Sequence, residues 1–167
     1  MDKNNVYIDD MVSVIMPAYN SGAYIEDAVK SVIEQTYENW ELIICDDKST
    51  DDTLSKAKKL AADDNRITVL ATEKNSGVAA ARNTAMDEAK GRYIAFLDSD
   101  DCWKPEKLEK QIGFMNDKKC AFCYSSYSFI DENGNAARSG KAPIKKSADY
   151  KSLLKDNFTG TLTIVLD

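Results

Sequence analysis

The sequence predicts an α/β protein with an open, doubly wound, mostly parallel sheet and helices on both faces. Short, almost continuously apolar runs alternate with amphipathic stretches, and this unit occurs four times along the chain. Strands that are apolar throughout are typical of parallel sheets buried on both faces, and right-handed crossovers between them give a doubly wound arrangement. The length of 167 residues and the apolar fraction of 43% suit one domain with its own core.

The apolar runs locate the strands. The first run, VSVIM, is stopped by Pro17, and the fourth, RYIAFL, is followed by an acidic cluster. An Asn-Gly pair at Asn133 and Gly134 predicts a hairpin turn after the fifth strand. The predicted strands are Val12–Met16, Glu41–Cys45, Arg66–Ala71, Arg92–Leu97, Cys120–Ile130 and Thr161–Leu166.

The helices are predicted where apolar residues recur at helical spacing. Asp and Ser residues suited to capping precede the second helix, and Gly91 is expected to end the third. Pro105 stands in the first-turn position that proline favours and starts the fourth. The predicted helices are Ala23–Gln35, Asp51–Ala62, Val78–Ala89, Pro105–Met115 and Ser147–Asn157.

Composition excludes several classes of protein. A net charge of −6 argues against non-specific nucleic-acid binding. No apolar run is long enough to cross a membrane, and the N-terminal MDKNNVYIDD lacks a signal-peptide pattern. The sequence therefore predicts a cytoplasmic protein, compatible with peripheral association at the inner face of the membrane. Because histidine is absent, any chemistry must use carboxylates, hydroxyls, amines, thiols or a metal held by oxygen.

The four cysteines are expected to be reduced thiols. Cys120 and Cys123 form a single CxxC, but a zinc site needs two further ligands. The pair also lies in an apolar run, so buried strand thiols are the favoured interpretation.

Polar residues gather where the predicted strands end. In an open parallel sheet, ligands bind outside the carboxyl ends of the strands. Turns, carboxylates and one cation from four separate segments are expected to meet at that edge. These residues are Pro17, Ala18, Tyr19, Asn20, Asp46, Asp47, Asn75, Gly77, Arg82, Asp98, Ser99, Asp100 and Asp101.

The cluster Asp98–Asp101 has two interpretations. Three carboxylates within four residues repel one another unless a cation joins them. Mg²⁺ or Mn²⁺ typically takes one or two carboxylates together with substrate phosphates, which favours a metal that bridges a diphosphate to the protein. The alternative is a solvated acidic loop that caps the helix starting at Pro105.

Asp47, Tyr19 and Arg82 are equally ambiguous when each is taken alone. Asp47 could accept a hydrogen bond from a bound base or a ribose hydroxyl, or it could stabilise the start of the helix Asp51–Ala62. Tyr19 could stack on a planar base or belong to the core. Arg82 could reach a phosphate across its alanine-rich helix, or it could lie at the surface or pair with the acidic loop. The convergence of these residues on one sheet edge favours a binding site.

The order of the motifs adds a resemblance. The chain carries, in sequence, VSVIMPAYN, SVIEQTYENWELIICDDKSTDDT, RITVL, NSGVAAARNTAMDEAKGRYIAFLDSDD and PEKLEKQ. This series resembles the N-terminal, nucleotide-sugar-binding half of family 2 glycosyltransferases with the A-type fold. The likeness implies an N-terminal extension over residues 1–11, a donor-binding core over residues 12–130 and an incomplete start of the acceptor-side region over residues 131–167.

The resemblance implies a role for each matching residue. Pro17, Ala18 and Tyr19 would frame the uracil, and Asp47 would accept from the uracil ring N–H. Asn75, Gly77 and Arg82 match the nucleotide-side loop and helix. Asp98-Ser99-Asp100 resembles the Asp-x-Asp signature, with Asp100 and Asp101 best placed for ribose and for Mn²⁺ or Mg²⁺.

The function implied is metal-dependent, inverting transfer from a nucleotide-diphospho-sugar, expected to be a UDP-sugar. The acceptor would be a hydroxyl of a glycan or lipid-linked molecule in polysaccharide or glycoconjugate synthesis. Because the family's catalytic base is expected beyond Asp167, the alternative is a nucleotide-sugar-binding module without transfer activity. Other doubly wound classes fit poorly: a pyrophosphorylase would carry a basic, Gly-rich loop after the first strand, and a phospho-receiver would carry acids after strands one and three.

Lys48 and the last predicted strand each carry a further expectation. Lys48 stands where the family usually has glycine, so either the turn differs or Lys48 leans towards phosphate. The strand Thr161–Leu166 is expected to expose apolar surface and to allow self-association into a homo-oligomer.

Overall fold

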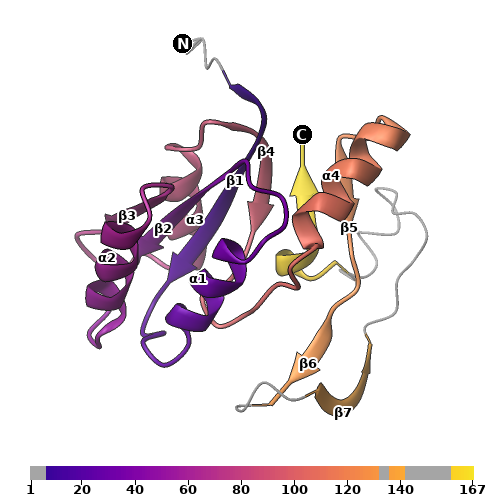
Figure 1. The fold of residues 1–167 in the computed structure, drawn as a ribbon. Helices are drawn as coiled ribbons and strands as arrows, with labels where there is room; N and C mark the ends of the chain where they lie inside the picture. The colour runs from indigo at the N-terminus through magenta and orange to yellow at the C-terminus, as the bar shows by residue number, and fades with distance from the viewer. Residues whose placement is uncertain (1–6, 132–135, 142–158) are drawn as a thin grey trace.

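The computed structural model describes residues 7–131, 136–141 and 159–167, with the backbone alone for residues 136–141. A six-stranded sheet forms its centre, in the order β3-β2-β1-β4-β8-β5 (Figure 1). β1 to β4 run parallel, and β8 is antiparallel to both of its neighbours, which confirms a mostly parallel sheet. The strands are β1 (Ile8–Ala18), β2 (Trp40–Asp46), β3 (Ile67–Ala71), β4 (Gly91–Phe96), β5 (Phe122–Tyr124) and β8 (Ile164–Leu166).

Helices cover both faces of this sheet, as predicted. One core cluster joins alternate residues of β1, such as Val14 and Met16, to α1 (Ile25–Ile33), α2 (Thr53–Asp63) and α4 (Lys107–Lys118). The intervening residues of the strands, such as Ile15, face the second cluster, formed with α3 (Val78–Met86). This alternation follows from the two-residue period of a strand. No helix in the described ranges has both the length and the apolar character needed to cross a bilayer.

The predicted strand Cys120–Ile130 is wrong as a single element. β5 belongs to the central sheet, whereas β6 (Ser128–Ile130) pairs antiparallel with β7 (Ala136–Lys141) in a separate two-stranded sheet. Both strands are rich in aromatic residues, and only the serines Ser125 and Ser126 stand where the chain changes its partner. The Asn133-Gly134 turn and the helix predicted at 147–157 lie outside the described residues.

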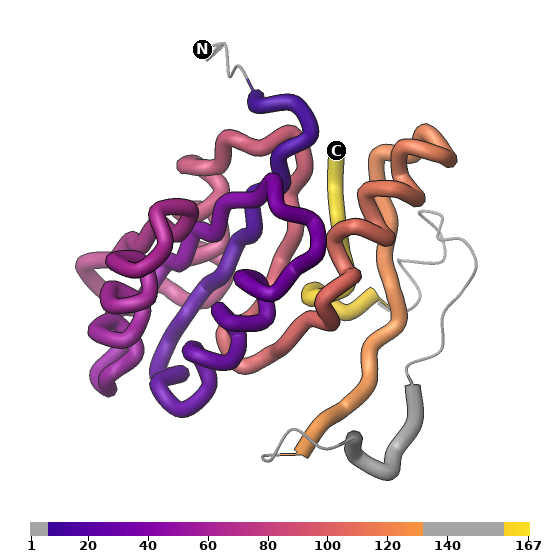
Figure 2. The backbone as a smooth tube through the Cα atoms, in the orientation of Figure 1, coloured from indigo at the N-terminus to yellow at the C-terminus, as the bar shows by residue number. Residues whose placement is uncertain are grey.

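The predicted exposure of the C-terminal strand is also wrong. A 3-10 turn, η1 (Thr161–Thr163), precedes β8, which hydrogen-bonds to β4 on one side and β5 on the other. Figure 2 shows this yellow segment running between the two strands. Val165 is fully buried, and Asp167 accepts from the Arg92 guanidinium at 2.6 and 2.8 Å. Because both edges of β8 are paired, this strand offers no free edge for self-association.

Gly91 does not end α3, which stops at Met86, but instead opens β4 against β1. A Cβ at Gly91 would lie 2.6 Å from the Met11 carbonyl oxygen and 2.8 Å from the Ser13 nitrogen. These backbone atoms can move only if the pairing of β1 with β4 shifts. The glycine is therefore required by close packing of two strands.

We expect Gly91→Ala to lower the free energy of unfolding by about 2–3 kcal/mol through this clash. Gly113→Ala is the matched control, since a Cβ there would meet no atom within 4 Å. That substitution lies inside α4 and should stabilise by roughly 0.5–1 kcal/mol through helix propensity. Urea unfolding of the two variants measures both effects, and a Gly91→Ala variant as stable as the unaltered protein would contradict the packing argument.

Candidate functional site

A cavity of about 430 Å³ opens at the carboxyl ends of β1, β2 and β4, beside the start of α3. This is the edge at which the sequence predicts a ligand. Of the residues predicted to bind the nucleotide-sugar, only Arg82 does not line this cavity. The predicted residues that line the cavity are Pro17, Ala18, Tyr19, Asp47, Asn75, Gly77, Asp98, Ser99 and Asp100.

Tyr24 also lines this cavity, and the sequence pattern hides its role. Its spacing matches the apolar face of the helix that follows, yet 52% of it is exposed. Tyr19, on the turn after β1, is 50% exposed and lines the same cavity. Exposed aromatic rings at a cavity offer flat surfaces on which a planar base can stack. The remaining lining residues are Asn20, Ser21, Val78 and Ala81.

Asp47 is buried and holds the start of α3. Its carboxylate accepts from the Ser76 N–H at 2.9 Å, the Gly77 N–H at 2.7 Å and the Thr72 hydroxyl at 2.9 Å. Burial would raise the pKa of Asp47, but the hydrogen bonds from Ser76, Thr72 and Gly77 outweigh it and lower the pKa below its ordinary value. Asp47 therefore stabilises α3 rather than the following helix α2, and it does so while lining the cavity.

The turn after Asp47 contains a residue with a left-handed backbone conformation. Lys48 has φ 63° and an exposed side chain. Asp46 supports the turn, since its buried carboxylate accepts from the Ser49 N–H at 3.1 Å. The conformation that favours glycine is thus present although lysine occupies the position, at a cost of roughly 1 kcal/mol.

Arg82 pairs with the acidic loop. Its Nη2 donates to the Asp98 carboxylate, and the side chains of both residues are partly buried. The interpretation of Arg82 as a partner of the loop is therefore the one the structure shows. Its Nε is buried and makes no hydrogen bond to the described residues.

The acidic loop does not cap α4 through its carboxylates. Glu106 occupies the N-cap without a side-chain hydrogen bond, and the Leu108 N–H donates to Gln35 Oε1 at 3.0 Å. Asp101 is half-buried, and burial, followed by the charges of Asp100 and Asp98, raises its pKa to about 6. Because burial and the neighbouring charges disfavour the ionised form of Asp101, a bound cation would stabilise that form.

A second cavity of about 310 Å³ adjoins the first and shares Asp100 with it. Asp100 and Asp101 form its polar side. Tyr127 and Phe129 contribute an aromatic pair, with ring centroids 5.5 Å apart in an edge-to-face arrangement. Ser128, Ile130, Gly160 and Leu162 complete the lining. The sequence gives no sign of this cavity, because its walls come from segments that meet only through the pairing of β5 with β8.

The first cavity offers oxygen ligands and no cation. Asp47, Asp98 and Asp100 line it, and none of its described lining residues is lysine or arginine. Within the described part of the chain, no three carboxylates or thiols form a ready-made metal site. The donor set fits a hard divalent cation that takes one or two carboxylates and completes its shell with phosphate oxygens and water.

The CxxC pair and Asp167, to which the sequence assigns no site role, lie away from the cavities. Cys123 is buried in β5, as predicted, whereas Cys120 precedes that strand and is half-exposed. Asp167 pairs with Arg92 at the opposite end of β4 from the cavities.

Comparisons with known proteins identify relatives over most of the chain. Residues 13–166 match the model of Glycosyl transferase family 2. The putative teichuronic acid biosynthesis glycosyltransferase TuaG of Bacillus subtilis (strain 168) is 47% identical over 94% of this chain and 62% of its own length. WfgD of Escherichia coli, a UDP-Glc:alpha-D-GlcNAc-diphosphoundecaprenol beta-1,3-glucosyltransferase, is 46% identical over 95% of this chain and 61% of its own. The chain thus spans about three-fifths of the length of these relatives.

Solved structures show the same architecture. S. aureus TarS 1-349 in complex with UDP has a TM-score of 0.62 and 33% identity, over 67% of this chain and 34% of that one. The mannosyltransferase PcManGT from Pyrobaculum calidifontis, in complex with GDP-Man and Mn²⁺, has a TM-score of 0.62 and 28% identity, over 66% and 34%. The chain therefore belongs to glycosyl transferase family 2 and has the family's A-type fold.

Proposed function

We propose that this chain binds the donor of a metal-dependent, inverting glycosyltransferase that uses a UDP-hexose. The acceptor is a sugar hydroxyl on a lipid-linked saccharide, in the synthesis of a surface polysaccharide. The observation that carries the proposal is the cavity itself, in which turns from three strands and a helix start bring together carboxylates and aromatic rings. The names of TuaG and WfgD, and the UDP bound to TarS, support the choice of donor and acceptor.

The uridine end belongs beside Tyr19, Tyr24 and Asp47. The two rings supply stacking surfaces for the base. Three donors bind the Asp47 carboxylate, and the Ser76 N–H contacts both oxygens, at 2.9 and 3.1 Å. Because a carboxylate has about four acceptor positions, the ring N–H of uracil would replace one of the two Ser76 contacts. The lowered pKa keeps Asp47 ionised to accept it.

The diphosphate end belongs beside Asp100 and Asp101. Two phosphates would meet carboxylates and no cationic side chain in the described lining, so binding requires a divalent cation between them. Asp100 and Asp101 would hold that cation, which would stabilise the negative charge that develops on the departing diphosphate. Arg82 keeps Asp98 paired and so limits the repulsion at this edge.

The hexose belongs in the second cavity. Asp100 joins the two cavities, so a sugar attached to the diphosphate would continue into the space beside Tyr127 and Phe129. Aromatic rings can pack against the apolar face of a pyranose while carboxylates accept from its hydroxyls. Exclusion of water by this wall would protect the donor from hydrolysis.

Calorimetry tests the proposal. We expect UDP to bind in the presence of Mn²⁺, and chelation by EDTA to abolish the binding. UDP-glucose should compete, whereas ADP should bind more weakly because Asp47 reads the uracil N–H. Absence of UDP binding with Mn²⁺ would overturn the proposal, and binding without turnover of UDP-glucose in a transfer assay would favour a binding module instead.

A further inference from the structure

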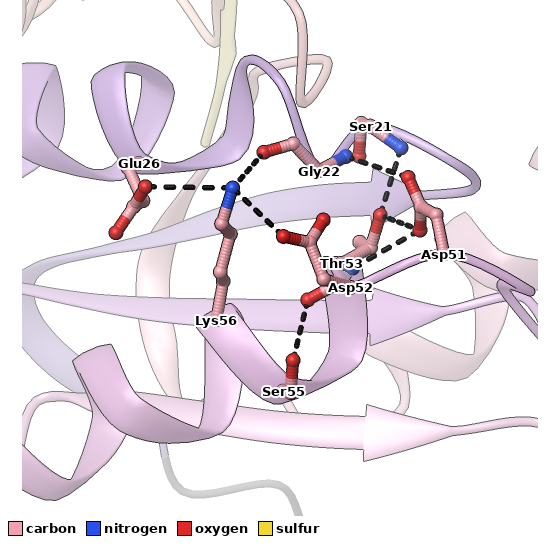
Figure 3. A network of polar contacts seen from close by, with 8 residues as sticks. All are labelled: Ser21, Gly22, Glu26, Asp51, Asp52, Thr53, Ser55 and Lys56. Carbon is pink, nitrogen blue, oxygen red and sulfur yellow. Dashed lines mark hydrogen bonds and ion pairs between the residues drawn. The ribbon is translucent and has the colours of Figure 1, made fainter.

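The turn that follows β1 is held in place by the start of α2, outside the cavity. The Ser21 N–H donates to Thr53 Oγ1 at 2.8 Å, and the Gly22 N–H donates to Asp51 Oδ2 at 3.0 Å. Thr53 Oγ1 donates in turn to Asp51 Oδ1 at 2.5 Å. Figure 3 shows these side chains meeting between the turn and the first residues of the helix. One threonine hydroxyl and one carboxylate thus fix two successive peptide groups.

Further bonds fix the turn on either side. The Asn20 N–H donates to Ser49 Oγ at 3.0 Å, and Asn20 Oδ1 accepts from the Thr50 N–H at 2.8 Å. Lys56 Nζ donates to the Gly22 carbonyl at 2.6 Å. Because the N–H groups of the turn donate to the protein, they are not free to cradle a phosphate, which distinguishes this turn from a backbone anion site.

We propose that Thr53 is a positioning residue for nucleotide binding. Its side chain is fully buried and is not among the residues that line the cavity, so it acts through Ser21. This inference rests on the proposed function, since Tyr19 and Asn20 belong to the turn and line the uridine end. Thr53 anchors the backbone of this turn to α2 through the Ser21 N–H. It thereby positions the Tyr19 ring and the Asn20 amide.

Loss of the Thr53 hydroxyl removes the partner of the Ser21 N–H. Ser21 is only 6% exposed, so its N–H would lose the Thr53 hydroxyl at a position with little access to water. A buried donor without a partner is costly, and the turn relieves that cost by moving. Asp51 Oδ1 would retain the Thr53 N–H at 3.0 Å, so the start of α2 stays anchored while the turn shifts.

The test compares isosteric and conservative replacements. Thr53→Val keeps the shape and removes the hydroxyl, and we expect it to weaken UDP binding with Mn²⁺ about tenfold by calorimetry. Thr53→Ser restores the hydroxyl and should bind within roughly threefold of the unaltered chain. Thr163→Val is the matched control, because Thr163 is 2% exposed and donates to the Gly160 carbonyl at 2.6 Å. It should lower the melting temperature as Thr53→Val does, but leave UDP affinity unchanged.

A second variant with its own control tests the same role if Thr53→Val does not fold. Asp51→Asn removes one acceptor from the turn and should weaken UDP binding, whereas Asp64→Asn should not. Asp64 also accepts from the N–H two residues on, at 3.0 Å, but at the far end of α2. Unchanged UDP affinity in both Thr53→Val and Asp51→Asn, or equal losses in the controls, would overturn the positioning role alone. Failure of the unaltered chain to bind UDP would overturn the proposed function, and this inference with it.

Discussion

Replacement of Asp100 by asparagine should lower the affinity for UDP in the presence of Mn²⁺ on the order of 100-fold. Asp100 lines both cavities and stands beside the proposed diphosphate position, where the hexose would pass into the second cavity. Asparagine keeps the shape of the side chain but loses the charge that attracts a divalent cation. Calorimetric titration with UDP at fixed Mn²⁺ measures the loss, and titration with Mn²⁺ in the presence of UDP assigns it to the cation.

The fold should not suffer from this change. Asp98 and Asp101 lose a like-charged neighbour, so the unfolding midpoint without metal should stay the same or rise slightly. Asp87→Asn is the matched control, because Asp87 is an exposed carboxylate at the end of α3 and lies outside both cavities. Equal UDP affinities in Asp100→Asn and the unaltered protein would place the cation elsewhere or remove the need for one.

Replacement of Lys107 by methionine should raise the free energy of unfolding by roughly 2–4 kcal/mol at pH 7. The Lys107 Nζ is buried and makes no hydrogen bond within the part of the chain that the structure describes. It lies 3.8 Å from the centroid of the Trp103 ring. Burial lowers the pKa of Lys107 to about 7, with Cys123 opposing the shift. Methionine fills the same space without a charge to desolvate.

The pH dependence separates this effect from simple repacking. The unfolded chain keeps the Lys107 proton up to its ordinary pKa of 10.5, whereas the folded protein loses it above about pH 7. The destabilisation is therefore complete below pH 7 and declines towards zero as pH rises to about 10. The advantage of Lys107→Met, followed by urea unfolding, should shrink over that window. Lys110→Met, on the same helix but 75% exposed, should change stability by less than about 0.5 kcal/mol at every pH; an advantage of Lys107→Met that is constant with pH would contradict the assignment.

Local patterns sufficed for the parallel half of the fold. β2, β4 and the buried part of β1 are apolar runs packed under helices that show their own periodicity, so neighbours in the chain locate them. β1 nevertheless extends from Ile8 through Pro17 to Ala18, beyond the predicted run, and the edge strand β3 is only partly buried. The cavity followed from the same pattern, because parallel strands end at one edge and carry their terminal residues there. Asp47 illustrates the limit: its place at the edge was predictable, but its bonds to Ser76 and Gly77 depend on the path of the loop before α3.

The antiparallel part of the sheet could not be predicted in the same way. β5 and β6 lie close together in an aromatic-rich segment, and the pairing with β8, for example of Cys123 with Val165, assigns β5 to the central sheet. Such pairing joins residues some forty positions apart, where no local period records it. The second cavity escaped prediction for the same reason, because Tyr127 and Leu162 become neighbours only once that pairing exists.

The position of β8 has a consequence for the order of folding. β1 to β4 can assemble as each leaves the ribosome, since every strand pairs with one already made or soon to follow. β5 has no place in the central sheet until residues 164–166 emerge and insert between it and β4. Closing so long a loop is slow, so β4 presents an unpaired edge during synthesis. The first cavity should thus form early, while the wall of the second cavity must wait for β8.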